Sequence, residues 1–256
     1  MSYMKVTRFK VDATTYTGFI KDGTIEVIQG DIYSEWSYTS QTFSIDEVVI
    51  QAPIVPNQII GIGANYVSKI EELPKELPEI PVFFFKPNSS LIGPEEKIVI
   101  PIGIDQVKFE SELAVVIGKK AKNISESEVK DYVYGYTIGN DVTAPQFFHE
   151  AGHWMIGKSF DTFTPLGPFI ETDLDPSQIS VKASLNGVEK QNSSTKLMII
   201  PINKMVSYLS TIMTLQPGDV ILTGSPVGAE FVGKGDSIAC EIKEIGSLVN
   251  TFVTAK

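Results

Sequence analysis

The hydrophobic pattern of the chain consists mainly of short apolar runs, many of them separated by glycine or proline. In the first fifty residues, segments 6–11, 15–20 and 25–28 alternate or are rich in β-branched and aromatic residues, which predicts three strands. The Asp22-Gly23 pair between the last two segments favours a tight hairpin turn. Beyond residue 55, the same criteria predict strands over residues 58–62, 82–86, 98–100, 113–117, 181–185 and 220–223.

Two segments follow the helical period instead. Residues 125–133 begin with Ser125 and Glu128 in the spacing of a capping box, and they place Val129 and Val133 on one face. Residues 44–47 resemble another helix start. Residues 202–214 form the second candidate helix, whose apolar stripe consists of Met205, Leu209, Ile212 and Met213.

The order of these elements indicates an α+β fold that is mostly β. The strands are too irregularly spaced, and too few helices lie between them, for a doubly wound parallel sheet. Pro53 and Pro56 interrupt the pattern near residue 55. We therefore predict a small, β-rich N-terminal domain of residues 1–55 and a larger domain of residues 56–256.

Charge and composition limit the classes of partner. The chain has 31 acidic and 21 basic residues and a net charge of −10, which argues against nucleic acid, whose binding needs clustered Lys and Arg. Arg8 is its one arginine. An anionic substrate must therefore be held by lysines, backbone N–H groups or a metal ion, because no bidentate guanidinium clamp lies beyond the N-terminal strand.

The expected compartment is the cytoplasm. Cys240 is the single cysteine, so no intramolecular disulfide can form, and a reducing compartment is the simple interpretation. The first residues lack the apolar core of a secretion signal. No apolar stretch approaches the ~18 residues that a membrane-spanning helix needs, so we predict no membrane association.

Two short motifs invite familiar interpretations that their context weakens. The Gly61-Ile-Gly63 turn after an apolar strand resembles part of a dinucleotide-binding fingerprint, but Tyr66 replaces the third glycine, and a tight turn is the alternative. His149-Glu-Ala-Gly-His153 matches the helical zinc-protease pattern. Because the chain has no third histidine and a segment rich in Pro and Gly follows, we expect these two histidines to be surface or lid residues.

Three carboxylates form a stronger candidate site. If the run after Phe109 is a strand, Glu110 and Glu112 point to the same side at its start, where they repel each other unless a cation or proton intervenes. Asp141 is placed similarly, at the end of another strand-like run. Oxygen ligands without Cys or His suit Mg²⁺ or Mn²⁺, and ordinary solvated surface acids remain the alternative.

From residue 59 onward, about three quarters of the chain resembles the fumarylacetoacetate hydrolase (FAH) superfamily. Five segments match that family's pattern in the same order: Glu110-Ser-Glu112-Leu-Ala-Val-Val-Ile-Gly118, Gly135-Tyr-Thr-Ile-Gly-Asn-Asp141-Val-Thr, Gly157-Lys158-Ser-Phe-Asp-Thr-Phe-Thr-Pro-Leu-Gly-Pro168, Asn186-Gly187 with Gln191 and Thr195, and Leu215-Gln-Pro-Gly-Asp219-Val-Ile-Leu-Thr223-Gly224-Ser-Pro226-Val-Gly228. The resemblance implies the family's β-roll, usually a homodimer, and Mg²⁺- or Mn²⁺-dependent chemistry on a small anionic substrate.

The resemblance also implies roles for individual residues. The metal ligands would be Glu110, Glu112 and Asp141, and Lys158 would lie near the metal and the substrate oxygens. Thr223 and Gly224 would form a turn that contacts the substrate carboxylate, and Tyr66 would also contact the substrate.

Two departures from the family pattern affect the expected reaction. Of the histidine and glutamate with which the family often activates water, this chain keeps the glutamate as Glu72 and has Lys69 in place of the histidine. The arginine and glutamine that commonly follow the metal aspartate are absent, because Pro145 and Phe148 occupy those positions. An ordinary lysine, with a pKa near ~10.4, is protonated at neutral pH, so we expect Lys69 to anchor a substrate carboxylate and Glu72 to transfer protons.

These roles together predict metal-stabilised enolate chemistry on an enolisable 2-oxo or 1,3-dioxo carboxylate. Isomerisation or decarboxylation is favoured, because hydrolysis alone requires a positioned, deprotonated water. A C–C bond hydrolase of the acylpyruvate or fumarylacetoacetate type is the alternative. A further alternative is a catalytically reduced family member that binds metal.

Overall fold

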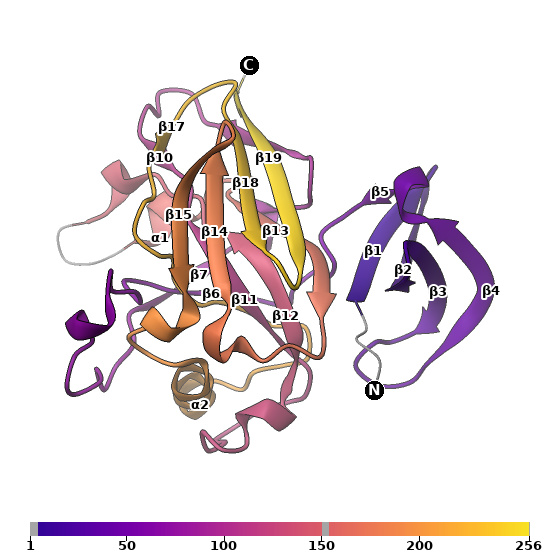
Figure 1. Ribbon diagram of the computed structural model, residues 1–256, viewed down its shortest axis with the longest axis horizontal. Coiled ribbons are helices and arrows are strands. Elements are labelled where there is room, and N and C mark those ends of the chain that lie inside the picture. Colours follow the sequence, from indigo (N-terminus) through magenta and orange to yellow (C-terminus); the bar gives the residue numbers. More distant parts are fainter. Residues whose placement is uncertain (1–4, 150–153, 256) are drawn as a thin grey trace.

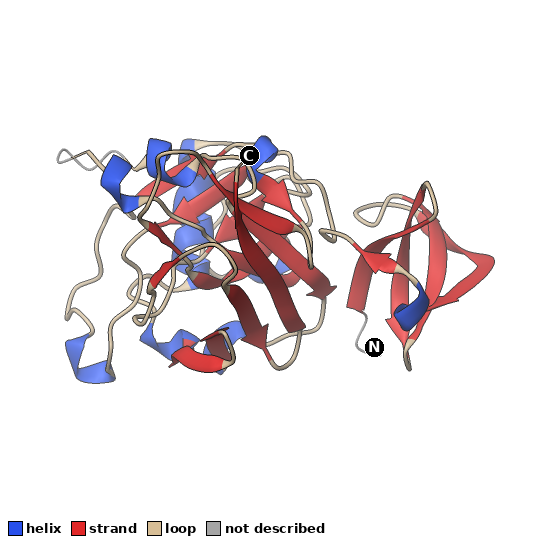
Figure 2. Cartoon of the chain, turned by 90° about the horizontal axis from the view of Figure 1, so that it is seen from above, coloured by secondary structure: helices blue, strands red, loops and turns tan. Residues whose placement is uncertain are grey.

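The computed structural model describes residues 5–149 and 154–255, and its β-strands form two large sheets and one small sheet. Figure 1 shows the N-terminal strands standing to one side of a larger body that contains the second sheet and the helices. Figure 2, seen from above, shows the same division. The predicted α+β class with mostly β structure is confirmed.

The N-terminal strands form an antiparallel meander with its own small core. The core consists of Phe9, Ile25 and Val27. Asp22 and Gly23 both adopt positive φ, as a two-residue hairpin turn between twisted strands requires. The strands are β1 (Lys5–Val11), β2 (Thr14–Lys21), β3 (Thr24–Gly30), β4 (Trp36–Ser44) and β5 (Val49–Ile50), of which β5 pairs with β1.

The meander continues into the largest sheet. Strand β1 pairs with a strand of the larger body through Lys5↔Glu171 and Val6↔Ile170. The sheet runs in the order β4-β3-β2-β1-β13-β12-β11-β16-β6-β7, and β8 pairs with β13 at its side. Its remaining strands are β6 (Ile59–Ile62), β7 (Phe83–Lys86), β8 (Leu91–Ile92), β11 (Ser111–Ile117), β12 (Val133–Asn140), β13 (Thr164–Glu171) and β16 (Val220–Leu222).

A five-stranded sheet packs against the central strands of the first one. Its order is β15-β14-β18-β19-β9, and β14, β18 and β19 contact β11, β12 and β13 across the main hydrophobic core. The strands are β9 (Lys97–Ile100), β14 (Ser180–Leu185), β15 (Val188–Ser194), β18 (Ser237–Ile242) and β19 (Gly246–Thr254), and a separate pair is formed by β10 (Val107–Lys108) and β17 (Phe231–Val232).

Strand β11 is buried on both faces, which explains its uninterrupted apolar sequence. Leu113 and Val115 belong to the core between the two sheets, whereas Ala114 and Val116 belong to a second core on the opposite face. The strand is therefore held rigidly from both sides, and the residues at its start have a fixed position relative to the sheet.

Helical structure is sparse. Helix α2 (Ile202–Ile212) confirms the second predicted helix and buries Met205 and Leu209, whereas α1 (Met155–Lys158) is a single turn. The 3₁₀ turns are η1 (Ile45–Glu47), η2 (Ile70–Glu72), η3 (Asn88–Ser90), η4 (Val129–Asp131), η5 (Pro145–Phe147), η6 (Pro176–Gln178) and η7 (Thr195–Leu197).

The helix predicted over residues 125–133 is wrong, although its capping contact forms. The backbone N–H and hydroxyl of Ser125 donate to Glu128 Oε2 at 2.8 and 2.6 Å. Only the short turn η4 follows, because β12 begins at Val133 and pairs along β11. Sheet pairing therefore overrides the local helix signal.

Within the described residues, no helix is long and apolar enough to cross a membrane. The division into domains of residues 1–55 and 56–256 stays a proposal, since β1 joins the two parts within one sheet.

Candidate active site

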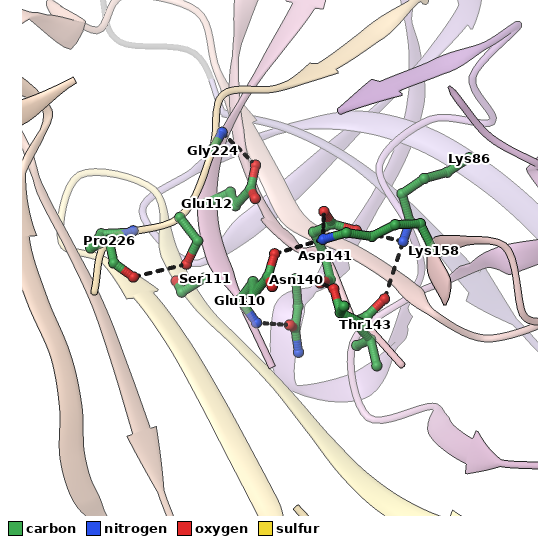
Figure 3. A network of polar contacts seen from close by, with 12 residues as sticks. Lys86, Glu110, Ser111, Glu112, Asn140, Asp141, Thr143, Lys158, Gly224 and Pro226 are labelled. Atoms are coloured by element: carbon green, nitrogen blue, oxygen red, sulfur yellow. Dashed lines mark hydrogen bonds and ion pairs between the residues drawn. The ribbon is translucent and has the colours of Figure 1, made fainter. Parts of the chain in front are cut away.

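The three predicted metal ligands meet at one end of the β11–β12 pair. Glu110 precedes β11, Glu112 is its second residue, and Asp141 follows β12 directly. Because the strands are antiparallel, with Ser111 opposite Asn140, the start of one lies beside the end of the other. One oxygen of each carboxylate lies within 4.8 Å of the others, in the arrangement that Figure 3 shows.

Two buried lysines neutralise part of this charge. Lys158, the last residue of α1, donates from Nζ to Glu110 Oε2 at 2.7 Å and to Asp141 Oδ2 at 2.5 Å. Lys86, the last residue of β7, donates to Asp141 Oδ1 at 2.6 Å and to the Val142 carbonyl at 3.3 Å. Both carboxylate oxygens of Asp141 thus accept from an ammonium group (Figure 3).

Burial and like charge control the protonation of the three acids. Burial, together with the neighbouring carboxylates, raises the pKa of Glu112 well above its ordinary value. The pKa of Glu110 is raised by burial too. For Asp141, burial is outweighed by Lys158 and Lys86, which hold its pKa below the usual range. Burial lowers the pKa of Lys86, whereas the two acids facing Lys158 outweigh burial and raise its pKa.

A cavity of about 220 Å³ opens beside the carboxylates. Phe148 and Trp154, whose rings stack at 5.3 Å, also line it. The complete described lining is Ile62, Gly63, Ala64, Glu110, Glu112, Asp141, Phe148, Trp154, Lys158, Ser225, Pro226 and Ala229. The lining therefore combines charged side chains with aromatic and apolar ones.

Thr223 and Gly224 lie beside the site, but their polar groups bind the protein itself. The Thr223 hydroxyl donates to the Leu113 carbonyl at 2.9 Å, and the Gly224 N–H donates to Glu112 Oε2 at 2.7 Å. Gly224 has a φ of 96°, and a Cβ there would lie 2.7 Å from Asn65 Cβ, so the turn needs glycine. In this structure the turn orients a carboxylate, and its contact with substrate stays a prediction.

The remaining predicted site residues do not line the described cavity. Lys69 and Glu72 form an ion pair of 3.8 Å on η2, with side chains 65% and 45% exposed. Tyr66 is partly buried, and burial followed by the charge of Glu112 raises the pKa of its hydroxyl. No hydrogen-bond partner of that hydroxyl is found among the described residues. The proposed roles of these three residues stay predictions.

The two short motifs have different outcomes. Gly61 lies in β6, and Gly63 packs against Trp154. Strand β6 pairs with β16 in parallel and with β7 in antiparallel orientation, and among the described residues no α-helix follows it before β7, so the motif is not part of a βαβ unit. Of the zinc-protease pattern, His149 is described, whereas Glu150 and His153 lie outside the described residues.

Sequence reasoning did not identify Lys86 or the aromatic wall. Lys86 ends the apolar run Phe-Phe-Phe-Lys, and a lysine at the end of a buried strand is the one signal that pointed to it. Trp154 and Phe148 flank a segment whose course the sequence does not reveal. Their stacking depends on where the chain returns after residue 148.

Comparisons with known proteins identify the family of the chain. The family model "Fumarylacetoacetate (FAA) hydrolase C-terminal" matches residues 58–253, and the model "Rv2993c-like, N-terminal" matches residues 4–53. The mitochondrial oxaloacetate tautomerase Fahd2a of Rattus norvegicus is 37% identical over 219 residues, which cover 81% of this chain and 70% of that protein.

Two solved structures extend the comparison to nearly the whole chain. The 5-carboxymethyl-2-hydroxymuconate delta-isomerase of Mycobacterium smegmatis has a TM-score of 0.92 and 37% identity, covering 98% of this chain and 100% of its own. The maleylpyruvate hydrolase of Sphingobium sp. SYK-6, in complex with manganese and pyruvate, has a TM-score of 0.81 and 27% identity, covering 99% and 100%. The chain thus belongs to the fumarylacetoacetate hydrolase family, whose β-roll it shares and whose members include isomerases, tautomerases and hydrolases.

Proposed function

We propose that this protein is a Mg²⁺- or Mn²⁺-dependent enzyme that isomerises or decarboxylates an enolisable 2-oxo or 1,3-dioxo carboxylate. The observation that carries the proposal is the buried cluster of three carboxylates beside a small cavity with an aromatic wall. Relatives named as an oxaloacetate tautomerase and a hydroxymuconate isomerase support the same reaction class.

The donor set fits a hard divalent ion. Glu110, Glu112 and Asp141 offer oxygen ligands, and no His or Cys is found among the described residues that line the cavity. Within the described part of the chain, Oε1 of both glutamates accepts no hydrogen bond, so these atoms are available to an ion. When bound, the ion would act as a Lewis acid that polarises the 2-oxo group and acidifies the adjacent C–H bond.

The chain's own residues supply the rest of the electrostatics. Lys158 Nζ is fixed by two carboxylates and lies 5.1 Å from the centre of the Phe84 ring, which stabilises it as a cation. A substrate oxygen that gains negative charge at this edge of the cavity is stabilised by that ammonium group. Trp154 and Phe148 add apolar surface to the cavity that would receive the substrate.

Hydrolysis of a C–C bond is the second candidate, because the maleylpyruvate hydrolase shares the fold at 27% identity. It requires a group that deprotonates water, and Lys69 stands where the family often has a histidine. A metal-binding protein with reduced activity is the third candidate. The expected homodimer and cytoplasmic location stay predictions.

A screen of metal-replete protein against about a dozen 2-oxo and 1,3-dioxo acids tests the proposal. Keto–enol conversion is followed by ultraviolet absorbance, decarboxylation by CO₂ release, and hydrolysis by product analysis. We expect conversion of 2-oxo acids in Mg²⁺ or Mn²⁺ that Lys158→Met abolishes, whereas Lys243→Met, at an exposed lysine, retains it.

Two results would contradict the proposal. The first is the absence of turnover with every acid and both metals, which would favour the binding protein. The second is wild-type hydrolysis as fast as decarboxylation or isomerisation and unaffected by Lys69→His, because water would then be activated elsewhere.

A further inference from the structure

A fully buried amide in the second sheet holds together two segments of the candidate site. Gln191 lies in β15, has 0% exposure and is not among the residues that line the cavity. Its Oε1 accepts from the Ser111 N–H at 3.0 Å. Its Nε2 donates to Ser225 Oγ at 2.8 Å and to the Pro226 carbonyl at 2.6 Å.

The first of these contacts completes a hydrogen-bond ladder at the carboxylate-bearing strand. The Leu113 carbonyl points to the edge of β11 that pairs with β16, where it accepts from the N–H and hydroxyl of Thr223. Ser111 lies two residues earlier on the same edge of β11, where β16 no longer pairs. Gln191 Oε1 takes the place of the missing strand there. It thereby fixes the peptide between Glu110 and Glu112, from which both carboxylates extend.

The second contact fixes another part of the cavity lining. Ser225 and Pro226 line the cavity directly after the Gly224 turn. The following chain lies against β15, since a Cβ on Gly228 would come within 2.1 Å of the Lys190 carbonyl. The two N–H groups of Gln191 are shared between the Ser225 hydroxyl and the Pro226 carbonyl, which leaves this segment little freedom to move away from β11.

We propose that Gln191 is a positioning residue that sets the separation between the two glutamate ligands and the Ser225–Pro226 wall. A glutamine is suited to this position because one planar group both accepts and donates hydrogen bonds. Oε1 governs metal binding, through Ser111, and Nε2 governs the fit of the substrate, through Ser225 and Pro226. The substrate arm rests on the proposed reaction, whereas the metal arm rests only on the binding of a divalent ion by Glu110 and Glu112.

Two substitutions separate the two arms. Gln191→Met keeps the length of the side chain and removes every hydrogen bond, so Mn²⁺ affinity is expected to fall about 10-fold to 100-fold, the range for groups that orient metal ligands. Gln191→Glu keeps the acceptor for Ser111 but removes the paired donors. We expect its Mn²⁺ affinity to stay within about 3-fold of wild type, while its KM rises about 10-fold or more and kcat changes less.

Asn250→Leu is the matched control. Asn250 is another buried amide, whose Nδ2 donates to the Gly93 and Glu96 carbonyls at 2.9 Å, away from the cavity. It is expected to lower the melting temperature and leave Mn²⁺ affinity and KM unchanged.

Calorimetric titration with Mn²⁺ measures the metal arm, and steady-state kinetics with the best 2-oxo acid from the screen measures the substrate arm. Wild-type Mn²⁺ affinity in Gln191→Met, or equal losses in Asn250→Leu, would overturn the inference. If no acid is turned over by the wild type, the proposed function fails, and the Mn²⁺ titrations still decide the role of Gln191.

Discussion

Replacing Lys86 by methionine tests how strongly the buried charges of the site depend on each other. The change removes the ammonium group that binds Asp141 Oδ1 at 2.6 Å and retains most of the side-chain volume. The Lys86 and Asp141 side chains are 0% and 2% exposed, so water cannot replace the lost partner. Lys86→Met therefore leaves Asp141 buried with Lys158 as its remaining cation among the described residues.

The expected cost follows from the geometry. Two unit charges at this separation attract by about 6 kcal/mol at an effective dielectric constant of about 20. The cost of burying the ammonium group, which also lowers the pKa of Lys86, cancels part of that attraction. Removing one partner of a buried pair typically costs 3–5 kcal/mol, and the remaining contact with Lys158 puts the expected loss near ~3 kcal/mol.

Urea denaturation at pH 7 in the presence of a chelator measures this loss, because no divalent ion can then compensate for the missing charge. Lys69→Met is the matched control, since its ion pair with Glu72 is 3.8 Å long and exposed. We expect that control to change the free energy of unfolding by less than about 1 kcal/mol. A free energy of unfolding for Lys86→Met equally close to wild type would refute the reasoning.

Four further outcomes are expected. Glu112→Ala should weaken Mg²⁺ and Mn²⁺ binding in calorimetry, and unchanged affinity would remove Glu112 from the ligand set. Gly224→Ala should cost about 1–3 kcal/mol in urea denaturation because its φ of 96° disfavours a side chain, and a wild-type midpoint would contradict this. Glu72→Gln should lower kcat on 2-oxo acids, and an equal kcat would exclude Glu72 from proton transfer. Hydrogen bonds from Ser125 lower the pKa of Glu128 in the folded state, so that stabilisation is present above the unfolded pKa near ~4.3 and is lost as the pH falls through the folded value. Ser125→Ala should therefore reduce the acid sensitivity of unfolding, and an identical pH profile would contradict the assignment.

The cluster of three carboxylates was predictable because it depends on local sequence and one pairing rule. Alternation places Glu110 and Glu112 on the same side of β11. Asp141 joins them because β11 and β12 are adjacent, antiparallel and in register, with Ser111 opposite Asn140. The apolar run that follows Glu112 was long enough to predict β11.

The parts that sequence reasoning missed depend on contacts between distant segments. Most of the polar segment of residues 34–42 lies in β4, an edge strand whose mostly polar, exposed side chains give little hydrophobic signal. Lys86 contacts Asp141 because β7 and β12 belong to the same sheet. The two residues are 55 positions apart, so the local sequence around Lys86 gives no sign of the contact. For the same reason, the sequence did not reveal that the Gly224 N–H donates to Glu112.

Under the proposed function, the balance of charges in the site would explain how a chain with a single arginine binds an anion. Three carboxylates and two lysines, Lys86 and Lys158, leave one negative charge when all five are ionised. Burial raises the pKa of both Glu110 and Glu112. Full ionisation of the three carboxylates is therefore unfavourable unless a further cation is bound. A divalent ion would reverse the balance to one positive charge, which complements the single carboxylate of a 2-oxo acid. Arg8, in the N-terminal strand β1, is then not needed at the site, and the selectivity for anions would depend on the ion together with Lys86 and Lys158.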